Sequence, residues 1–315
     1  MTESMTAGAG ALARSAVLFD ATPTTTLVSL AGPDTESLLQ GVVSQDVKAL
    51  AAGRHAPALL LTPKGGLIAA LEILRLSHDA FLVACDALVG EAVAKKLARY
   101  VISEDVVVTD VSADHAVLSL RGPKAPAIAD AERLAPGALA VEGTATVVRS
   151  EICGLAAVDL VLLRPSAAAK RHALLAAGAV EVDAAFAEGL RVESGRIRSG
   201  KDADESTLGP ETRLESVAVS YTKGCYVGQE TIARIKTYGQ VNRLLVGLEF
   251  EGEPAREGDA ITIDGKDVGK VTSVARGPRL GRPIALATVR REHAEPGTRV
   301  LAGAVAATVA ALPFA

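Results

Sequence analysis

The residues after Gln240 constrain the fold most, because their pattern differs from everything before them. Short apolar runs follow one another at regular spacing and are separated by glycine, proline and charged residues. These runs are Leu244–Phe250, Ala260–Ile263, Val268–Val274, Ile284–Val289, Val300–Leu301 and Ala306–Leu312. Short strands divided by turn residues are typical of a small all-β barrel or sandwich. We therefore expect a separate C-terminal β domain over residues 240–315.

The chain before Gln240 instead mixes strand and helix patterns. A strand at Leu27–Leu30 ends near a Gly-Pro pair and is followed by a helical pattern, and the same order recurs at Val117–Leu120. This repetition predicts two mixed α/β units of similar plan, and 315 residues give room for two or three domains. Residues 1–13 are small and polar-leaning, which predicts a loose tail.

Composition and charge exclude several classes of protein. Hydrophobic residues make up 49% and charged residues 22% of the chain, which is ordinary for a folded protein. The net charge of −4 argues against a dedicated nucleic-acid binder. No apolar run reaches the roughly 20 residues that span a bilayer, and no signal peptide pattern opens the chain, so we expect a cytoplasmic protein. Cys85, Cys153 and Cys225 form no CxxC pair, so no metal site or disulfide framework is predicted.

The chemically densest stretch is the octet Lys-Gly-Cys-Tyr-Val-Gly-Gln-Glu, which runs from Lys223 to Glu230. Its two glycines suit tight turns. The spacing of Ile232 and Ile235 predicts that Cys225 lies on a loop leading into a short helix. The N–H groups at a helix start, together with Lys223, can lower a thiol pKa. Two interpretations of Cys225 stay open, a reactive thiol and a small buried hydrophobe.

The octet, with Arg234 and Arg243 downstream, resembles the YgfZ branch of the glycine-cleavage T-protein (aminomethyltransferase) superfamily. The similarity covers nearly the whole chain. Further segments similar to this family are Leu30–Asp34, Leu97–Tyr100, Arg191–Gly195, which matches an R-x-E-x-G segment, and Gly269–Pro278.

The resemblance implies an α+β fold, a three-domain ring with two mixed α/β units and a C-terminal all-β barrel or sandwich. Residues 14–105 together with 190–239 would form a folate-binding core domain, residues 106–189 a second α+β domain, and residues 240–315 the barrel domain. The ligand implied is tetrahydrofolate or a one-carbon derivative of it.

The same resemblance supplies candidate binding residues. A glutamate of the R-x-E-x-G segment recognises the pterin in the family, and Glu193 occupies that place. A carboxylate can accept two hydrogen bonds from the aminopyrimidine edge of a pterin. Lys223, Gln229 and Arg234 are further candidates, either for the glutamate tail of the folate or for holding the loop of Cys225. The alternative for each of these three is an ordinary surface or capping contact.

One departure from the family pattern bears on enzymatic activity. T-proteins carry an Asp pair shortly after a Gly-Gly turn, whereas here Gly65 and Gly66 lead into Ala69 and Ala70. An alanine can neither orient a folate nitrogen nor exchange a proton. Glu72 would share a strand face with Ala70, about 7 Å along. We therefore do not expect a true aminomethyltransferase.

Three interpretations of function follow. The first is a folate-binding accessory protein with Cys225 as a functional thiol, whose partners are folate and iron–sulfur client or assembly proteins. It would support iron–sulfur cluster assembly or repair in those clients. The second is a folate-dependent aminomethyl- or methyltransferase, or a demethylase, that uses Glu72, Asp202 or Asp204 as its carboxylate. The third is an interaction scaffold that has lost folate.

Overall fold

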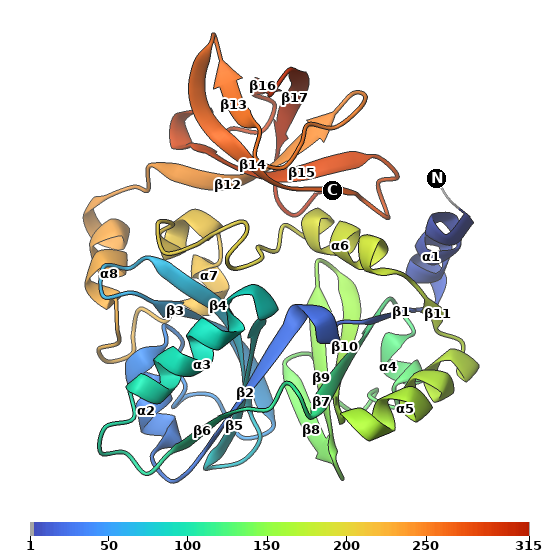
Figure 1. Ribbon diagram of the computed structural model, residues 1–315, viewed down its shortest axis with the longest axis vertical. Coiled ribbons are helices and arrows are strands. Elements are labelled where there is room, and N and C mark those ends of the chain that lie inside the picture. The colour runs from blue at the N-terminus through green and yellow to red at the C-terminus, as the bar shows by residue number, and fades with distance from the viewer. Residues whose placement is uncertain (1–2, 315) are drawn as a thin grey trace.

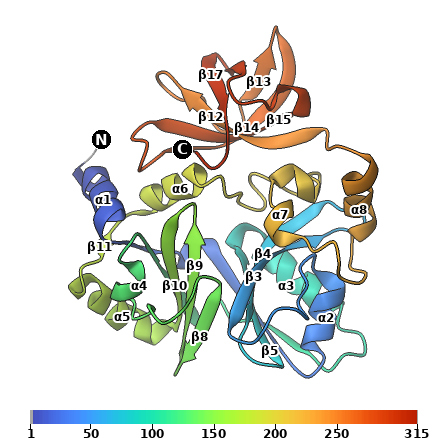
Figure 2. The ribbon, with the colours of Figure 1, turned by 180° about the vertical axis from the view of Figure 1, so that it is seen from behind.

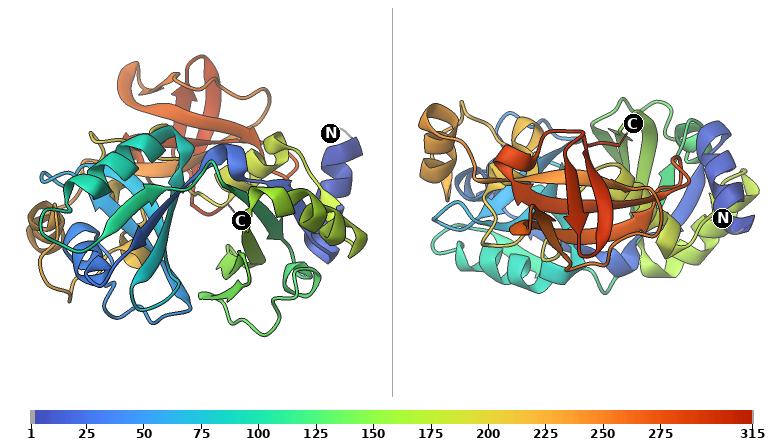
Figure 3. Two further views of the ribbon diagram at one scale, coloured as in Figure 1. Left: turned by 60° about the horizontal axis from the view of Figure 1, so that its bottom comes forward. Right: turned by 90° about the horizontal axis from the view of Figure 1, so that it is seen from above.

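The computed structural model describes residues 3–314, which form two mixed α/β units and a C-terminal barrel (Figure 1). The barrel lies across one end of the two units, over α6 (Ala184–Glu193) and α7 (Glu215–Ala218), in both the front and the back view (Figures 1 and 2). Seen from above, it covers the junction between the units (Figure 3). The α+β class expected from the sequence is confirmed, and of the two expected C-terminal forms the structure has the barrel.

One sheet of eleven strands runs through both α/β units in the order β11-β1-β7-β10-β9-β8-β3-β4-β5-β2-β6. Its strands are β1 (Val17–Asp20), β2 (Thr25–Ala31), β3 (Arg54–Leu61), β4 (Leu67–Arg75), β5 (Ala80–Asp86), β6 (Val107–Asp110), β7 (His115–Arg121), β8 (Ala138–Glu142), β9 (Ala145–Ile152), β10 (Leu155–Leu163) and β11 (Val180–Glu181). Strand pairing joins the two halves of the sheet at Arg54 of β3 and Ala138 of β8.

Short helices cover and connect these strands. They are α1 (Glu3–Arg14), α2 (Thr35–Val42), α3 (Gly90–Arg99), α4 (Ala125–Ile128), α5 (Arg164–Ala176), α6, α7 and α8 (Gln229–Tyr238), with 3-10 turns η1 (Thr22–Thr24), η2 (Ala87–Val89), η3 (Gly209–Thr212) and η4 (Arg291–His293). Among the described residues no helix is long and apolar enough to cross a membrane.

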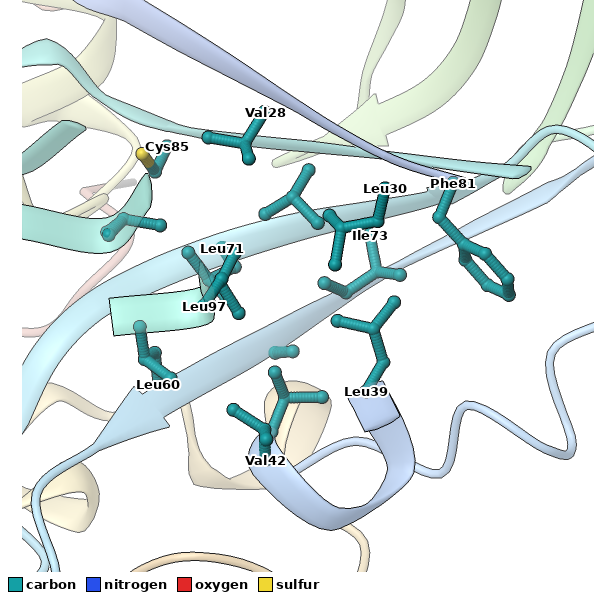
Figure 4. Packing of buried hydrophobic residues seen from close by; sticks show 14 of the residues in the cluster. Val28, Leu30, Leu39, Val42, Leu60, Leu71, Ile73, Phe81, Cys85 and Leu97 are labelled. Carbon is teal, nitrogen blue, oxygen red and sulfur yellow. The ribbon is translucent and has the colours of Figure 1, made fainter. Parts of the chain in front are cut away.

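The core of the first unit lies between its sheet and the helices α2 and α3 (Figure 4). Val28, Leu30 and Ile73 point from the strands toward Leu39 of α2 and Leu97 of α3. The opposite face of the same strands packs against the second unit through a separate cluster of Leu27, Leu74, Leu82, Val117, Leu139, Val148 and Val161. Residues on this second face of β2, β4 and β5 are therefore turned toward the other unit.

The barrel closes in the order β12-β15-β14-β13-β16-β17. Its strands are β12 (Arg243–Phe250), β13 (Ala260–Ile263), β14 (Lys266–Arg276), β15 (Pro283–Arg290), β16 (Arg299–Ala302) and β17 (Val305–Ala310). Inward-facing Val, Ile, Leu and Ala side chains fill it, which suits a chain that has no Trp. Closure leaves no open sheet edge in this unit.

Two observations refine the sequence expectations. Residues 1–13 were expected to form a loose tail, but Glu3–Arg14 is a helix, and its Leu12 is buried against Val182 and Phe186. The apolar residues of this helix are small, which conceals their periodicity in the sequence. Strand β1, inside the segment 14–105, pairs with β7 of the second unit. The domain boundaries given above stay a proposal.

Candidate functional site

The Gly-Gly turn of the hairpin between β3 and β4 is enclosed by two other segments. A Cβ atom on Gly66 would lie 2.0 Å from the backbone oxygen of Glu205, and one on Gly65, whose φ is +82°, would lie 2.9 Å from Thr231 of α8. These close approaches require glycine at both positions. The turn therefore joins the polar loop 195–215 to the helix that follows the octet.

The alanine pair lies a short way along β4 from this turn. Ala69 is buried in the core of the first unit. Ala70 is on the opposite face, where its N–H donates to Ser199 Oγ at 3.0 Å. Both methyl groups lie in packed surroundings, and neither position offers a polar side chain.

Glu72 lies on the same face of β4 as Ala70 and forms an ion pair with His55 of β3. The distance from His55 Nδ1 to Glu72 Oε1 is 2.5 Å, and the other ring nitrogen lies 3.0 Å from the carbonyl oxygen of Arg149. Burial lowers the pKa of His55, but the hydrogen bond and charge of Glu72 outweigh it and raise the pKa above its usual range. Both ring nitrogens face acceptors, an arrangement that favours the imidazolium form, which donates to both.

The Glu72 side chain is 29% exposed, and its second carboxylate oxygen accepts no hydrogen bond from another described residue. A second carboxylate, on the other unit, lies close enough to His55 for its charge to raise the pKa of the imidazole. Asp159 of β10 accepts from Ser119 Oγ at 2.6 Å and from Arg121 at 2.9 Å. Burial raises the pKa of Asp159, but Arg121 and Ser119 hold it below its usual range.

The other two carboxylates expected as catalytic candidates have different surroundings. Asp202 is buried, and its Oδ1 accepts from the hydroxyls of Thr272 and Ser273, both at 2.6 Å. Its Oδ2 accepts from Arg191 at 2.7 Å and from the N–H of Arg198 at 2.8 Å. All of its hydrogen-bonding capacity is used to join the loop to the barrel, which leaves none for a substrate.

Asp204 closes a turn within the loop and is solvent exposed. Its carboxylate accepts from the N–H and the hydroxyl of Ser206. Of the three candidates, Glu72 alone combines a free carboxylate oxygen with a position on the face that bears Ala70.

Each named residue of the R-x-E-x-G segment contacts the C-terminal barrel. Arg191 donates to Ser273 of β14 at 2.7 Å. A Cβ on Gly195, whose φ is +68°, would lie 2.9 Å from Leu312. Glu193 accepts at Oε2 from Arg279 N–H at 3.2 Å and at Oε1 from Leu280 N–H at 3.1 Å. This segment therefore holds the barrel on the α/β units.

The Glu193 carboxylate is only 1% exposed, and its two oxygens accept one N–H each from the loop after β14. A paired set of N–H donors of this kind is what the aminopyrimidine edge of a pterin presents. The oxygens of Glu193 therefore fit a pterin, and the barrel loop occupies them in this structure.

The octet is fixed at its first residue. Lys223 is buried, and its Nζ donates to the carbonyl oxygens of Gln40, Val43 and Gln45 at 2.6, 2.7 and 2.8 Å. Burial lowers the pKa of Lys223 to about 8. The lysine caps the C-terminal end of α2, so all of its donors are used within the protein.

The remaining octet candidates lie on the surface or near it. Cys225 is exposed, so the interpretation as a buried hydrophobe is wrong. Gln229 begins α8, and its Oε1 accepts from the N–H of Tyr226 at 3.3 Å. Arg234 is exposed and forms no ion pair with another described residue. No hydrogen bond joins Cys225 to Glu193 in the described part of the chain.

The other two cysteines lie apart from this loop. Cys85 is buried in the first core, where burial raises the pKa of its thiol to about 12. Cys153 is half-buried in a turn after β9, and its thiol donates to the carbonyl oxygen of Ser194. Within residues 3–314 no three His, Cys, Asp or Glu side chains gather as a metal site.

Sequence reasoning missed His55 and the Asp159–Arg121 pair. Asp159 could have been recognised from the sequence, because it is the one charged residue within the apolar run Leu155–Leu163. His55 carried none, because its contact with Glu72 depends on the pairing of β3 with β4.

Comparison with protein families gives two matches. The GCVT N-terminal domain matches residues 1–223. The glycine cleavage T-protein C-terminal barrel domain matches residues 243–315. Together they cover the α/β units and the barrel described above.

Individual relatives agree with these matches. An aminomethyltransferase of Herpetosiphon aurantiacus is 31% identical over 301 residues, which cover 90% of this chain and 82% of the relative. An aminomethyltransferase of Streptomyces avermitilis is 29% identical over 289 residues, which cover 86% of this chain and 77% of the relative. The crystal structure of glycine cleavage system aminomethyltransferase T from Bartonella henselae superposes with a TM-score of 0.88 at 25% identity, covering 99% of this chain and 89% of that one.

Proposed function

Because the chain belongs to the glycine cleavage T-protein family, we propose that it binds a tetrahydrofolate-type ligand and takes part in aminomethyl or methyl transfer. The aminomethyltransferases among its relatives favour this activity over the iron–sulfur role. The observation that carries the proposal is the Glu72–His55 pair on the face of the sheet that bears Ala70. This pair supplies a carboxylate close to Ala69 and Ala70, which stand where T-proteins have their Asp pair.

The roles of the residues follow from their contacts. His55 donates to one oxygen of Glu72 and so fixes the carboxylate, while the second oxygen is free to orient an amine or accept a proton. Glu72 lies about 7 Å along the strand from Ala70, so the reacting group would sit correspondingly further from the hairpin turn. When bound, tetrahydrofolate supplies the nitrogen atoms that carry the one-carbon unit.

Glu193 is the proposed pterin-binding residue. The N–H groups of Arg279 and Leu280 occupy the oxygens that a pterin would use. Ligand binding at this carboxylate would therefore displace the barrel loop. This makes the barrel part of the folate site. Gln229 and Arg234 stay candidates for the glutamate tail, whereas the donors of Lys223 are engaged by α2.

A transfer assay with tetrahydrofolate and an aminomethyl donor tests the role of Glu72. We expect Glu72→Gln, which keeps the size and removes the charge, to lower kcat by about 100-fold or more. Asp204→Asn is the matched control and should retain the wild-type rate, because Asp204 only closes a turn. If Glu72→Gln has the same kcat as the wild type, Glu72 does not replace the missing Asp pair as the catalytic carboxylate.

A second candidate function is a YgfZ-type, folate-binding accessory protein for iron–sulfur cluster assembly or repair in client enzymes of the cytoplasm. The observation in its favour is the exposed Cys225, on a loop held by the buried Lys223, together with the missing Asp pair. A single thiol can act only as a shared or passing ligand to a cluster. Wild-type protein that binds tetrahydrofolate but shows no transfer with any donor would select this function.

A further inference from the structure

A surface cleft of about 480 Å³ lies beside the octet and is separate from the site above. It is lined by Pro210, Arg213, Glu215, Ser216, Val219, Tyr221 and Lys236. These residues come from η3, α7, the segment before the octet, and α8, so the cleft lies where the first unit approaches the strand β12 of the barrel. Its polar lining contains two cations and one carboxylate.

Arg213 is held in the cleft by its backbone and by one hydrogen bond. Its φ is +63° and its ψ is +9°, a left-handed conformation that is unfavourable for a non-glycine residue. Its Nε donates to the carbonyl oxygen of Leu245 on β12 at 2.6 Å. This bond fixes the plane of the guanidinium and leaves its two terminal nitrogens without a described partner. A fixed guanidinium fork matches the two oxygens of a carboxylate or phosphate.

The second cation is also held in place. Lys236 Nζ lies 4.7 Å from the centre of the Tyr221 ring, and its distance to Glu215 is 3.5 Å. Glu215 in turn accepts from the hydroxyl of Tyr221. Glu215, the one carboxylate of the cleft, is thus bound to Tyr221 and Lys236. The charge of Arg213 is left unbalanced within the lining, so the cleft has a net positive charge.

Two further arginines lie on the strands β12 and β15, close in sequence or pairing to Leu245. Arg243, two residues before the Leu245 that holds Arg213, lies directly opposite Arg290 in the pairing of β12 with β15. Like charges at opposed positions destabilise a sheet. Within the described residues neither arginine forms an ion pair. Burial raises the pKa of the Glu211 carboxyl, and the N–H and the charge of Arg243 partly offset this effect. Glu211 therefore balances part of the charge of Arg243, and the anion site rests on Arg213 and Lys236.

We propose that this cleft binds an oxyanion-bearing ligand, a carboxylate or a phosphate, through the Arg213 fork and Lys236. The apolar sides of Pro210 and Val219 would contact the body of such a ligand. The site does not depend on folate or on Glu72. Its failure and the failure of the proposed function are therefore separate results.

Calorimetric titration of the full chain with pyrophosphate and with triglutamate, at constant ionic strength, tests this proposal. We expect saturable binding of at least one probe. Binding of pyrophosphate alone assigns a phosphate ligand, and binding of triglutamate alone assigns a carboxylate ligand. Binding of both supports an oxyanion site open to either group. Binding of neither probe overturns the proposal.

Variants decide whether the anion binds at this cleft. Arg213→Gly removes the guanidinium at a backbone conformation that glycine adopts without strain, so the fold should be retained. It should weaken binding about 10- to 100-fold, as expected for a lost charge-assisted pair. Arg213→Lys, which keeps the charge and loses the fork, should bind with intermediate affinity. Lys266→Gln, at an exposed cation of the barrel, is the control and should bind as the wild type does. Unchanged affinity in Arg213→Gly would contradict the assignment.

Discussion

At the residue scale, most of the buried charged side chains discussed above are hydrogen bonded to other groups of the protein. Asp202, Glu193 and Lys223 use their hydrogen-bonding groups within the protein, and each joins two segments distant in sequence. The Glu72–His55 pair differs, because one of its carboxylate oxygens accepts no hydrogen bond from another described residue. Truncating one partner of a buried pair costs more than the pair itself contributes.

The raised pKa of His55 predicts that the stability of the protein depends on pH. The contribution of the protonated imidazole is fully present below the ordinary pKa of about 6.5 and is lost as the pH rises through the higher folded pKa. The free energy of unfolding should therefore fall above pH 6.5, by at most about 1.4 kcal/mol per pH unit for one proton. Denaturant unfolding between pH 5.5 and 7.5, below the pKa of about 8 of Lys223, measures this loss as a shift of the unfolding midpoint.

His55→Gln should remove that dependence in the same pH range. The control is His78→Gln, at an exposed turn between β4 and β5, which should keep the wild-type slope. If the wild type and His55→Gln have the same slope, the imidazolium assignment is wrong.

The sequence predicted that Glu72 and Ala70 share a face, since that follows from strand alternation alone. It could not predict His55. A bulge between Leu60 and Leu61 shifts the pairing of β3 with β4, so that Pro57 lies opposite Glu72. Without the bulge, His55 would point to the other face of the sheet. A one-residue irregularity therefore decides whether this pair exists.

At the element scale, the octet loop and the β3–β4 hairpin are fitted to each other through glycines. The sequence suggested tight turns at both Gly224 and Gly228. Only Gly228 has a positive φ, +83°, and a Cβ there would lie 2.6 Å from the backbone oxygen of Thr62. Gly224 has nothing within 4 Å of its Cβ position. Local composition identified the loop, but only the packing of a distant hairpin distinguishes the two glycines.

This difference predicts the outcome of two matched substitutions. Gly228→Ala should lower the free energy of unfolding by about 1–3 kcal/mol, because it adds both backbone strain and a clash with the hairpin. Gly224→Ala should change it by less than about 0.5 kcal/mol. Denaturant unfolding of both variants measures the difference. Equal effects would mean that the loop does not pack against the hairpin as described.

At the scale of the whole molecule, the barrel is attached to the α/β units through the segment that contains Glu193, the proposed pterin-binding residue. Arg191, Glu193 and Gly195 all contact barrel residues, and Asp202 joins the same region to β14. The sequence located the barrel well, since its strand pattern is local. It could not predict this attachment, because Asp202 and Ser273 lie 71 residues apart and meet only when both units have folded.

Calorimetric titration of tetrahydrofolate into the wild type, Glu193→Gln and Cys225→Ser tests whether Glu193 forms a folate site. We predict saturable binding by the wild type, about 10-fold or weaker binding by Glu193→Gln, and unchanged binding by Cys225→Ser. Amide exchange at Arg279 and Leu280 should also become faster when the ligand binds, because their acceptor is taken. Absence of binding by the wild type, or equal affinity in Glu193→Gln, would contradict the proposed folate site.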